Sequence, residues 1–137
     1  MDMLDAILLK MHKDFDKWNT LKKKVEETQV EVFANQREIW WSHLGINIGS
    51  EVCGKNNPFE RPVLVLKVFS KNLILVAPLS TKIKDTPNHI EVRIGQNVSY
   101  LMVEHIKTIS TKRLSRKISR VENEIFAEIY KKYKSLL

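Results

Sequence analysis

The chain has 137 residues, 43% of them hydrophobic and 28% charged, so it is the size of one domain, can build a core and is not a disordered protein. Its formal net charge of +7 is uneven, because residues 1–60 hold 8 Lys or Arg and 10 Asp or Glu, whereas residues 61–137 hold 15 and 6. Such a basic half attracts polyanions such as nucleic acid, although a lysine-rich surface that only keeps a protein in solution explains the charge equally well.

The single cysteine, Cys53, excludes an internal disulfide and any zinc site built on a cysteine pair. A free thiol fits a reducing cytoplasm best. The N-terminus shows no secretion signal, and no apolar run approaches the length of a membrane span. We therefore expect a cytoplasmic protein that does not associate with a membrane.

The first segment, residues 2–27, is predicted to form one long amphipathic helix, so residues 1–30 are treated as an N-terminal extension. The segment contains no Gly or Pro. Its apolar residues recur at alternating spacings of three and four and form one seam: Leu4, Leu8, Met11, Phe15, Trp18, Leu21 and Val25. A seam of this length has to be covered by the body of the domain or by another chain.

The middle of the chain, about residues 30–109, is predicted to be rich in strands. Aromatic and β-branched residues indicate a strand at 38–42, and two apolar runs, 63–69 and 73–77, flank a turn and indicate an antiparallel hairpin. Further short strands are expected at 89–94, 98–102 and 106–109. Short strands with turn signals and no intervening helices predict a small antiparallel barrel, closed or nearly closed.

A second helix is predicted at the C-terminal end. Ser119 and Glu122 have the spacing of a capping box, so the helix should start near Arg120. The residues expected on its apolar stripe are Val121, Ile125, Ile129 and Tyr133. The predicted fold class is therefore mainly β with a helix on either side.

Several kinds of chemistry find no support in the sequence. There is no Gly-rich phosphate loop and no GxSxG motif, and the histidines His12, His43, His89 and His105 are scattered rather than set at metal-ligand spacing. A Ser/His/Asp triad has no positive signal either. We expect neither a metal nor a cofactor.

Polar side chains stand instead at the ends of the predicted hairpin. Arg61 opens the first strand, and Ser80 and Thr81 follow the second, so the hairpin would bring Arg61 and Ser80 to the same open end. An arginine fork beside a hydroxyl group suits a phosphate. The structural alternatives are a salt bridge from Arg61 to Glu51 or Glu60, and for Ser80 an ordinary strand-end hydroxyl.

Six blocks of the sequence resemble, in order, those of the PemK/MazF family of toxins from type II toxin–antitoxin pairs. They are REIWWSHLG, GSE, RPVLVLK, APLST, NHIEV and EHIKTISTKRL. The resemblance covers roughly residues 36–120, and with the C-terminal helix it implies a toxin domain at 36–137. It implies a small SH3-like barrel shared with the gyrase poison CcdB, and usually a homodimer. It also implies a metal-independent endoribonuclease that cuts single-stranded RNA at a short motif and is neutralised by a cognate acidic antitoxin.

The resemblance also implies roles for residues. Arg61 takes the place of the catalytic arginine, and Ser80 stands where the family usually has threonine, with Thr81 beside it, so either hydroxyl can act. Glu104 stands where an acid serves as the base in one branch of the family, and Glu51 lies on the loop over the RNA site. The residues expected to bind substrate are Glu51, Trp41, His43, Phe59, Lys82, His89 and His105; His105 departs from the glutamine of most members.

The mechanism expected from these roles is attack by the RNA's own 2′-hydroxyl, with Glu104, His105 or His89 as the base. The products would be a 2′,3′-cyclic phosphate and a 5′-hydroxyl end. Two other functions stay open: a DNA gyrase poison of the CcdB type, and a degenerate module that binds RNA or antitoxin without catalysis. The N-terminal helix either packs on the barrel or across a dimer interface, which we prefer, or lies over the RNA groove and lowers activity.

Overall fold

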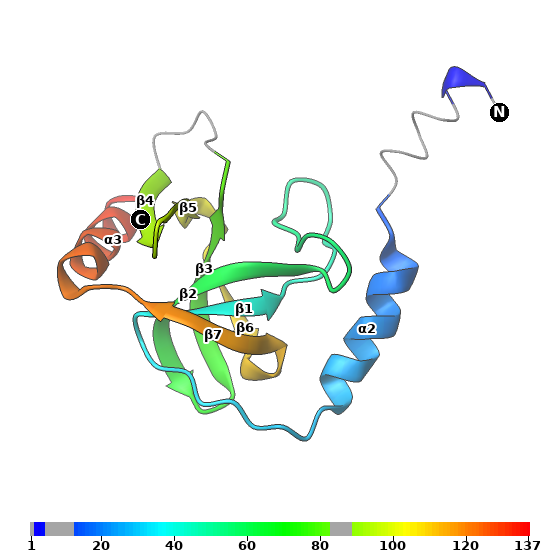
Figure 1. Ribbon diagram of the computed structural model, residues 1–137, viewed down its shortest axis with the longest axis horizontal. Coiled ribbons are helices and arrows are strands. Elements are labelled where there is room, and N and C mark those ends of the chain that lie inside the picture. The colour runs from blue at the N-terminus through cyan, green and yellow to red at the C-terminus, as the bar shows by residue number, and fades with distance from the viewer. Residues whose placement is uncertain (1, 5–12, 83–88) are drawn as a thin grey trace.

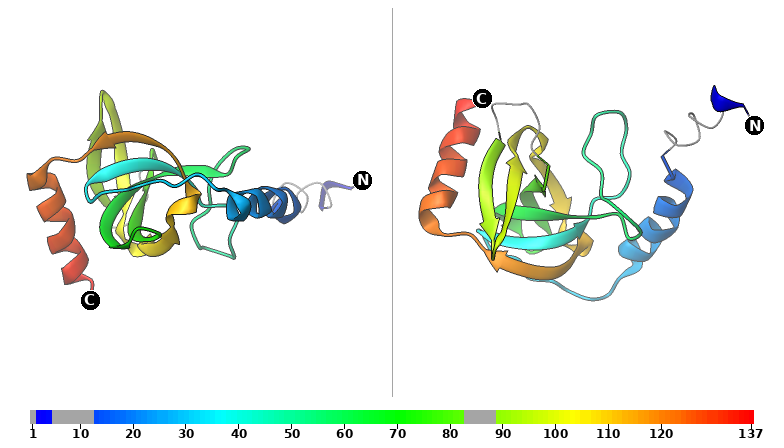
Figure 2. Two further views of the ribbon diagram at one scale, coloured as in Figure 1. Left: turned by 90° about the horizontal axis from the view of Figure 1, so that it is seen from below. Right: turned by 45° about the horizontal axis from the view of Figure 1, so that its top comes forward.

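The structure is a computed structural model that describes residues 2–4, 13–82 and 89–137. Its centre is a seven-stranded antiparallel sheet that curls into a half-barrel, with helix α2 (Phe15–Glu27) at one end and helix α3 (Asn123–Ser135) at the other (Figure 1, Figure 2). This arrangement confirms the predicted class, a small barrel-like β-fold with flanking helices. In the described part of the chain, the sheet curls without closing.

The remaining elements are given in chain order. The strands are β1 (Glu38–His43), β2 (Glu60–Ser70), β3 (Leu73–Ser80), β4 (His89–Ile94), β5 (Asn97–Met102), β6 (Lys107–Ser110) and β7 (Leu114–Arg120). Two 3₁₀ turns, η1 (Val103–His105) and η2 (Thr111–Arg113), flank β6. None of the helices among the described residues is long and apolar enough to cross a membrane.

Strand β3 is the central connection of the sheet. The strand order is β4-β5-β3-β2-β1-β7, and β6 pairs with β3 as well. Along one edge β3 pairs with β2; along the other it pairs with β6 from Leu73 to Val76 and with β5 at Leu79 and Ser80. Ser80 therefore lies where the β2–β3 hairpin meets the β4–β5 hairpin.

The predicted hairpin is confirmed, and its register decides the geometry of the site. Val63 of β2 lies opposite Pro78 of β3. Arg61 and Ser80 therefore lie at the same open end of the hairpin, as the sequence predicts, after two register shifts in β2 between Val65 and Lys67 and between Val68 and Ser70. The turn is one residue tighter than expected, because Ser70 already pairs across it. The other predicted strands appear as β1, β4, β5 and β6, within about two residues of their expected ends.

The region before α3 differs from the prediction. Ser119 does not cap a helix, because it lies in β7 and pairs with Ile39 of β1. Helix α3 starts at Asn123, with Glu122 in the N-cap position and no side-chain cap. Strand β7 itself was not predicted, because its sequence is mostly polar and most of its side chains are exposed.

The buried face of α3 also differs in part from the predicted stripe. Ile129 is fully buried as expected, but the second buried residue within the helix is Phe126. Val121 is buried just before the helix begins. Ile125 and Tyr133 are half-buried.

The single long helix predicted over residues 2–27 is wrong in one respect. Residues 13 and 14 are not helical; Asp14 caps α2, and its Oδ1 accepts a hydrogen bond from the Lys17 amide at 3.0 Å. An aspartate in this position satisfies an amide that the first turn leaves unpaired, so it favours a start at Phe15. The part of the seam at residues 5–12 lies outside the described residues.

Two clusters of buried side chains form the hydrophobic core. One lies under α3 and includes Ile39, Leu64, Leu101 and Ile129. The other includes Leu44, Val63, Val65, Ile74, Val76, Ile109 and Leu114. Both groups draw on β2 and β3, so the hairpin that carries Arg61 and Ser80 is fixed by core packing on both of its faces.

Candidate active site

A small cavity of about 130 Å³ opens where β2 begins and β3 ends. Arg61, Ser80 and Thr81 meet there, so the cavity collects three of the four residues predicted to be catalytic. Its lining consists of Trp41, Lys55, Asn56, Glu60, Arg61, Pro62, Leu79, Ser80, Thr81 and Ser99. A basic fork, the hydroxyls of Ser80, Thr81 and Ser99, and an aromatic ring around one hollow are suited to a phosphodiester with a base beside it.

The guanidinium of Arg61 is held in place by the backbone. Its Nε donates to the Cys53 carbonyl oxygen at 2.9 Å, and one Nη donates to the Leu79 carbonyl oxygen at 3.2 Å. Among the described residues these bonds use two of the five N–H donors of an arginine, which leaves donors for a bound anion. Burial lowers the pKa of Arg61 from its ordinary value, with Cys53 acting in the opposite direction, yet an arginine stays charged at neutral pH.

The two hydroxyl groups differ in exposure. Ser80 is 6% exposed, and its Oγ accepts a hydrogen bond from the Lys82 amide at 3.2 Å. That bond occupies an acceptor site and leaves the hydroxyl proton of Ser80 able to point into the cavity. Thr81 is exposed. Ser80 is therefore the more rigidly placed donor, and Thr81 the more accessible one.

Ser42 lies next to Arg61 across β1 and β2. It is fully buried, and its Oγ has no hydrogen-bond partner among the described residues. A buried hydroxyl without a partner costs free energy, so this end of β1 is less well satisfied than an ordinary core.

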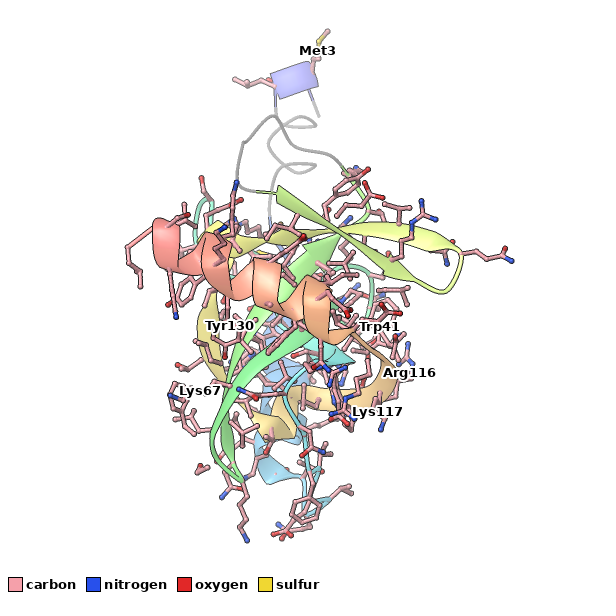
Figure 3. All side chains as sticks on the ribbon, turned by 90° about the vertical axis from the view of Figure 1, so that its left-hand side faces the viewer. Met3, Trp41, Lys67, Arg116, Lys117 and Tyr130 are labelled. Carbon is pink, nitrogen blue, oxygen red and sulfur yellow. The ribbon has the colours of Figure 1, made fainter. Side chains whose placement is uncertain are left out.

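A polar cluster around Glu60 adjoins the cavity on the β1–β7 side. The Glu60 carboxylate lies 3.3 Å from a guanidinium nitrogen of Arg116 and 3.8 Å from His43 Nε2. The Arg116 guanidinium lies 5.0 Å from the centre of the Trp41 ring, and Figure 3 shows these two side chains close together beside β7. Trp41 therefore has a cation on one side and lines the cavity as well.

Backbone hydrogen bonds around Gly45 hold together the loop that connects β1 and β2. The Gly45 amide donates to the Phe59 carbonyl at 3.2 Å, and the Gly54 amide donates to the Gly45 carbonyl at 2.7 Å. Cys53, the residue before Gly54, supplies the carbonyl that holds Arg61. This hydrogen-bonded loop is therefore in direct contact with Arg61.

Phe59 has a strained backbone, with φ at +57°. A left-handed conformation costs a residue with a side chain roughly 1–2 kcal/mol. The Phe59 ring meets the Trp18 ring of α2 edge to face, with centroids 5.8 Å apart. Such a pair contributes roughly 0.5–1.5 kcal/mol beyond the buried area, which is comparable to the strain.

Trp18 packs against the same β1–β2 loop. It is 5% exposed, and the Arg113 guanidinium lies 5.8 Å from its ring centre. A Cβ built on Gly45 would come within 2.0 Å of the Trp18 ring, so only glycine fits beneath the indole. The φ of +75° at Gly45 also favours glycine.

The remaining predicted residues whose side chains the structure describes do not line the cavity. Glu51 is exposed and accepts a hydrogen bond from the Ile48 amide at 2.9 Å, and Lys82 is exposed just past β3. Glu104 and His105 lie on η1. His89 is the first residue of β4, but its side chain lies outside the described part of the structure.

Lys107 and Arg113 are two partly buried basic residues that the sequence did not point out. Burial lowers the pKa of Lys107 from its ordinary value, the Arg113 charge lowers it further, and Glu51 and Cys53 act in the opposite direction. Burial also lowers the pKa of Arg113. One Nη of Arg113 donates to the His43 carbonyl at 3.0 Å. The signal available in the sequence was only the excess of basic residues after position 60.

A larger groove of about 440 Å³ lies between α2 and η2. Its lining includes Trp18, Lys22, Lys112 and Arg113, but none of the residues predicted to take part in chemistry. The smaller cavity is the candidate site, because Arg61 and both hydroxyls meet there. Among the described residues, no group of three or more His, Cys, Asp or Glu side chains is arranged to hold a metal ion.

The sequence matches one protein family over residues 35–137, described as PemK-like, MazF-like toxins of type II toxin–antitoxin systems. None of the curated proteins matches the chain by sequence.

Several solved structures have a similar fold. MazF from Deinococcus radiodurans has a TM-score of 0.63 at 17% identity, covering 77% of this chain and 97% of that protein. The toxin MazF-mt6 of Mycobacterium tuberculosis has a TM-score of 0.56 at 18% identity, with coverage of 72% and 94%. A mycobacterial endoribonuclease in complex with its cognate antitoxin has a TM-score of 0.58 at 12% identity, with coverage of 74% and 92%. At such identities the likeness concerns the fold.

Proposed function

The chain belongs to the PemK-like, MazF-like toxins of type II toxin–antitoxin systems, and from this premise we propose that it is an endoribonuclease that cleaves single-stranded RNA in the cytoplasm. The observation that carries the proposal is the cavity in which Arg61, Ser80 and Thr81 meet beside Trp41. Two of the structurally similar proteins are described as an endoribonuclease and as a toxin, which supports the same class of activity.

The reaction is a transesterification within the RNA. The 2′-hydroxyl oxygen attacks the adjacent phosphorus, its proton passes to a base, and the bond from phosphorus to the 5′-oxygen breaks. The leaving oxygen takes a proton from a water molecule, which completes a 5′-hydroxyl end, and the other fragment ends in a 2′,3′-cyclic phosphate. Arg61 stabilises the charge that develops on the phosphate oxygens, and Ser80 or Thr81 donates a hydrogen bond to them.

The substrate has to be unpaired, because a base can stack on an aromatic ring only when it leaves its helix. Trp41 is the ring that lines the cavity. Phe59, also predicted to bind substrate, packs against Trp18 instead, so we assign it a supporting role in the loop.

Besides His105 and His89, two carboxylates are candidates for the base. Glu60 lines the cavity but is engaged by Arg116 and His43, whereas Glu104 lies on η1 at the position suggested by the family resemblance. The variants Glu60→Gln and Glu104→Gln decide between them: the one that acts as the base flattens the acid limb of the pH–rate profile when it is replaced.

Regulation follows from the family. We propose that a cognate acidic antitoxin neutralises the toxin, in keeping with the similar structure solved with its cognate antitoxin and with the +7 charge of this chain. We also propose that the toxin is a homodimer. Light scattering of the purified protein tests the dimer, and RNA cleavage with and without the antitoxin tests neutralisation.

The direct test is cleavage of a fluorescent single-stranded RNA library by purified protein in EDTA. We expect cyclic-phosphate and 5′-hydroxyl ends, and a loss of about 100-fold or more in kcat for Arg61→Ala because one preorganised charge contact is removed. Ser80→Ala and Thr81→Ala, measured side by side, identify the hydroxyl that acts.

Three outcomes would contradict the proposal. RNA that stays intact with folded wild-type protein, or an Arg61→Ala variant that cuts as fast as wild type, removes the assigned chemistry. Inhibition of DNA gyrase without RNA cleavage would point to a poison of the CcdB type instead.

A further inference from the structure

We infer that Trp18 of helix α2 is a positioning residue for Arg61, so that a segment outside the matched family region holds the catalytic arginine in place. The inference rests on the proposed function for its catalytic consequence. Its structural part, that Trp18 fixes the Arg61 side chain through the β1–β2 loop, stands independently.

The first step is the contact between the helix and the loop. Trp18 is buried against Gly45 and meets Phe59 edge to face. Lys13, just before α2, adds two hydrogen bonds from its Nζ, to the carbonyls of Asn47 at 2.6 Å and Gly49 at 3.0 Å. The N-terminal end of α2 is therefore attached to the first half of the loop as well as to its last residues.

The second step runs through the loop backbone. Gly45 lies directly beneath the indole and accepts the Gly54 amide at 2.7 Å. The peptide group between Cys53 and Gly54 supplies both that amide and the carbonyl that accepts from Arg61 Nε at 2.9 Å. One peptide group thus joins the surface under Trp18 to the guanidinium of Arg61.

A strained residue, Phe59, also lies between Trp18 and Arg61. Phe59 is in the left-handed region and lies two positions before Arg61. Its carbonyl accepts the Gly45 amide at 3.2 Å, and its ring meets the Trp18 ring edge to face. Without the indole, the ring contact that offsets the backbone strain at Phe59 is lost. The chain entering β2 is then free to relax.

The helix acts by support and not by covering the site. No α2 residue lines the cavity that contains Arg61, Ser80 and Thr81, within the described residues. The reading in which the N-terminal helix lies over the substrate groove and lowers activity has no contact to support it in that part of the chain. Removal of Trp18 should therefore slow cleavage and not speed it.

The test combines a structural readout with a kinetic one on the full-length chain. In ¹⁵N-labelled wild-type protein, the Arg61 Nε proton should exchange slowly with water because the Cys53 carbonyl holds it. In Trp18→Ala we expect this exchange to be about tenfold faster or more, while the amide of Ile39 in the core keeps its protection. A protein that is destabilised as a whole would lose both.

The kinetic readout separates positioning from binding. For Trp18→Ala we expect kcat to fall about tenfold with KM within about twofold of wild type, because misplacing a catalytic group affects the transition state more than the bound substrate. Trp18→Phe, which keeps a ring over Gly45, should recover most of the rate. Lys13→Ala changes no packed ring and should shift both readouts in the same direction by a smaller factor.

Phe15→Ala is the matched control, because it removes another aromatic ring from the same helix, one that is 45% exposed. It should leave the Arg61 exchange and kcat unchanged. The inference is overturned if Arg61 exchange is the same in wild type and Trp18→Ala, if Phe15→Ala has the same effect as Trp18→Ala, or if Trp18→Ala raises kcat. If wild-type protein cuts no RNA, the proposed function fails, and the exchange measurement still decides the structural inference.

Discussion

The two helices at opposite ends of the sheet are attached in different ways (Figure 1, Figure 2). Helix α3 buries Phe126 and Ile129 in the core cluster that it shares with the sheet strands. Helix α2 buries one residue, Trp18, and buries it against a loop. The difference teaches that α3 is a part of the fold, whereas α2 is a support for the site.

Strand β1 runs between the two ends and shows the same contrast. At its first residue, Glu38 accepts hydrogen bonds from the Asn35 amide, from Trp40 and from Lys117. Near its last residue, Ser42 is buried with no partner among the described residues. The end under α3 is fully satisfied, and the end beside the cavity is not, as is common where a protein serves function at some cost in stability.

The largest effect is expected from the α3 end. Ile129→Ala removes a fully buried side chain and should lower the free energy of unfolding by about 3 kcal/mol. Urea denaturation measures the loss. The cleavage rate per folded molecule should stay near that of wild type, and a large drop in kcat without a change in stability would break the comparison.

Hydrogen exchange compares the two helices in one sample. Amides of α3 should exchange only through near-global unfolding, because the helix is part of the core. Amides of α2 should exchange about 100-fold faster through local opening, because few buried contacts hold that helix. Equal protection of the two helices, measured by mass spectrometry or NMR, would show that α2 is as much a part of the fold as α3.

A pH titration tests the satisfied end of β1. Burial by itself raises the pKa of Glu38, but the bonds from Asn35, Trp40 and Lys117 outweigh it and hold the pKa below its ordinary value of 4.5. The charged form is therefore favoured by folding, so its stabilisation is present above the ordinary pKa and is lost as pH falls through the lower folded pKa.

Glu38→Gln should thus cost about 1–2 kcal/mol at pH 7, because charged hydrogen bonds become neutral ones. The difference in free energy of unfolding between wild type and variant should narrow as the pH is lowered to 3. Denaturation midpoints at several pH values measure it, with Glu31→Gln as an exposed control. A gap that stays constant with pH would show that the carboxylate charge of Glu38 is not what stabilises this end.

The smallest effect is expected at the other end of β1. Ser42→Ala removes a buried hydroxyl that lacks a partner and should raise the free energy of unfolding by about 1 kcal/mol. A loss of stability would mean that the hydroxyl is bonded after all. Kinetics of the same variant show whether this neighbour of Arg61 also affects cleavage.

The sequence was most informative where structure is local. The β2–β3 hairpin follows from two apolar runs and a short turn, which bring Arg61 and Ser80 to the same end; their alignment there depends on two register shifts in β2 that the sequence does not indicate. Strand β7 escaped prediction because its polar side chains show no apolar pattern; it is held by pairing with β1. The apparent cap at Ser119 is a local signal overridden by that pairing.

The support of the site depends on contacts between distant residues, and these have no signal in the chain. Nothing in the spacing of Trp18, Gly45 and Phe59 indicates that they touch, because their contact is made by the path of a 16-residue connection from β1 to β2. The role expected for Phe59 as a stacking surface for RNA came from its place in that loop. Its ring meets Trp18 of α2 edge to face, and its part in binding RNA stays a prediction.

The fit of Trp18 over Gly45 has a consequence for how this protein can change by descent. Gly45 lies inside the matched family region, and Trp18 lies outside it. Any side chain at position 45 would displace the indole, so Trp18 can keep its place only while position 45 is glycine. Recombination that exchanged the domain without its leading helix would leave an empty hollow at Gly45, and lineages that lost the helix would be released from the steric reason to keep a glycine there.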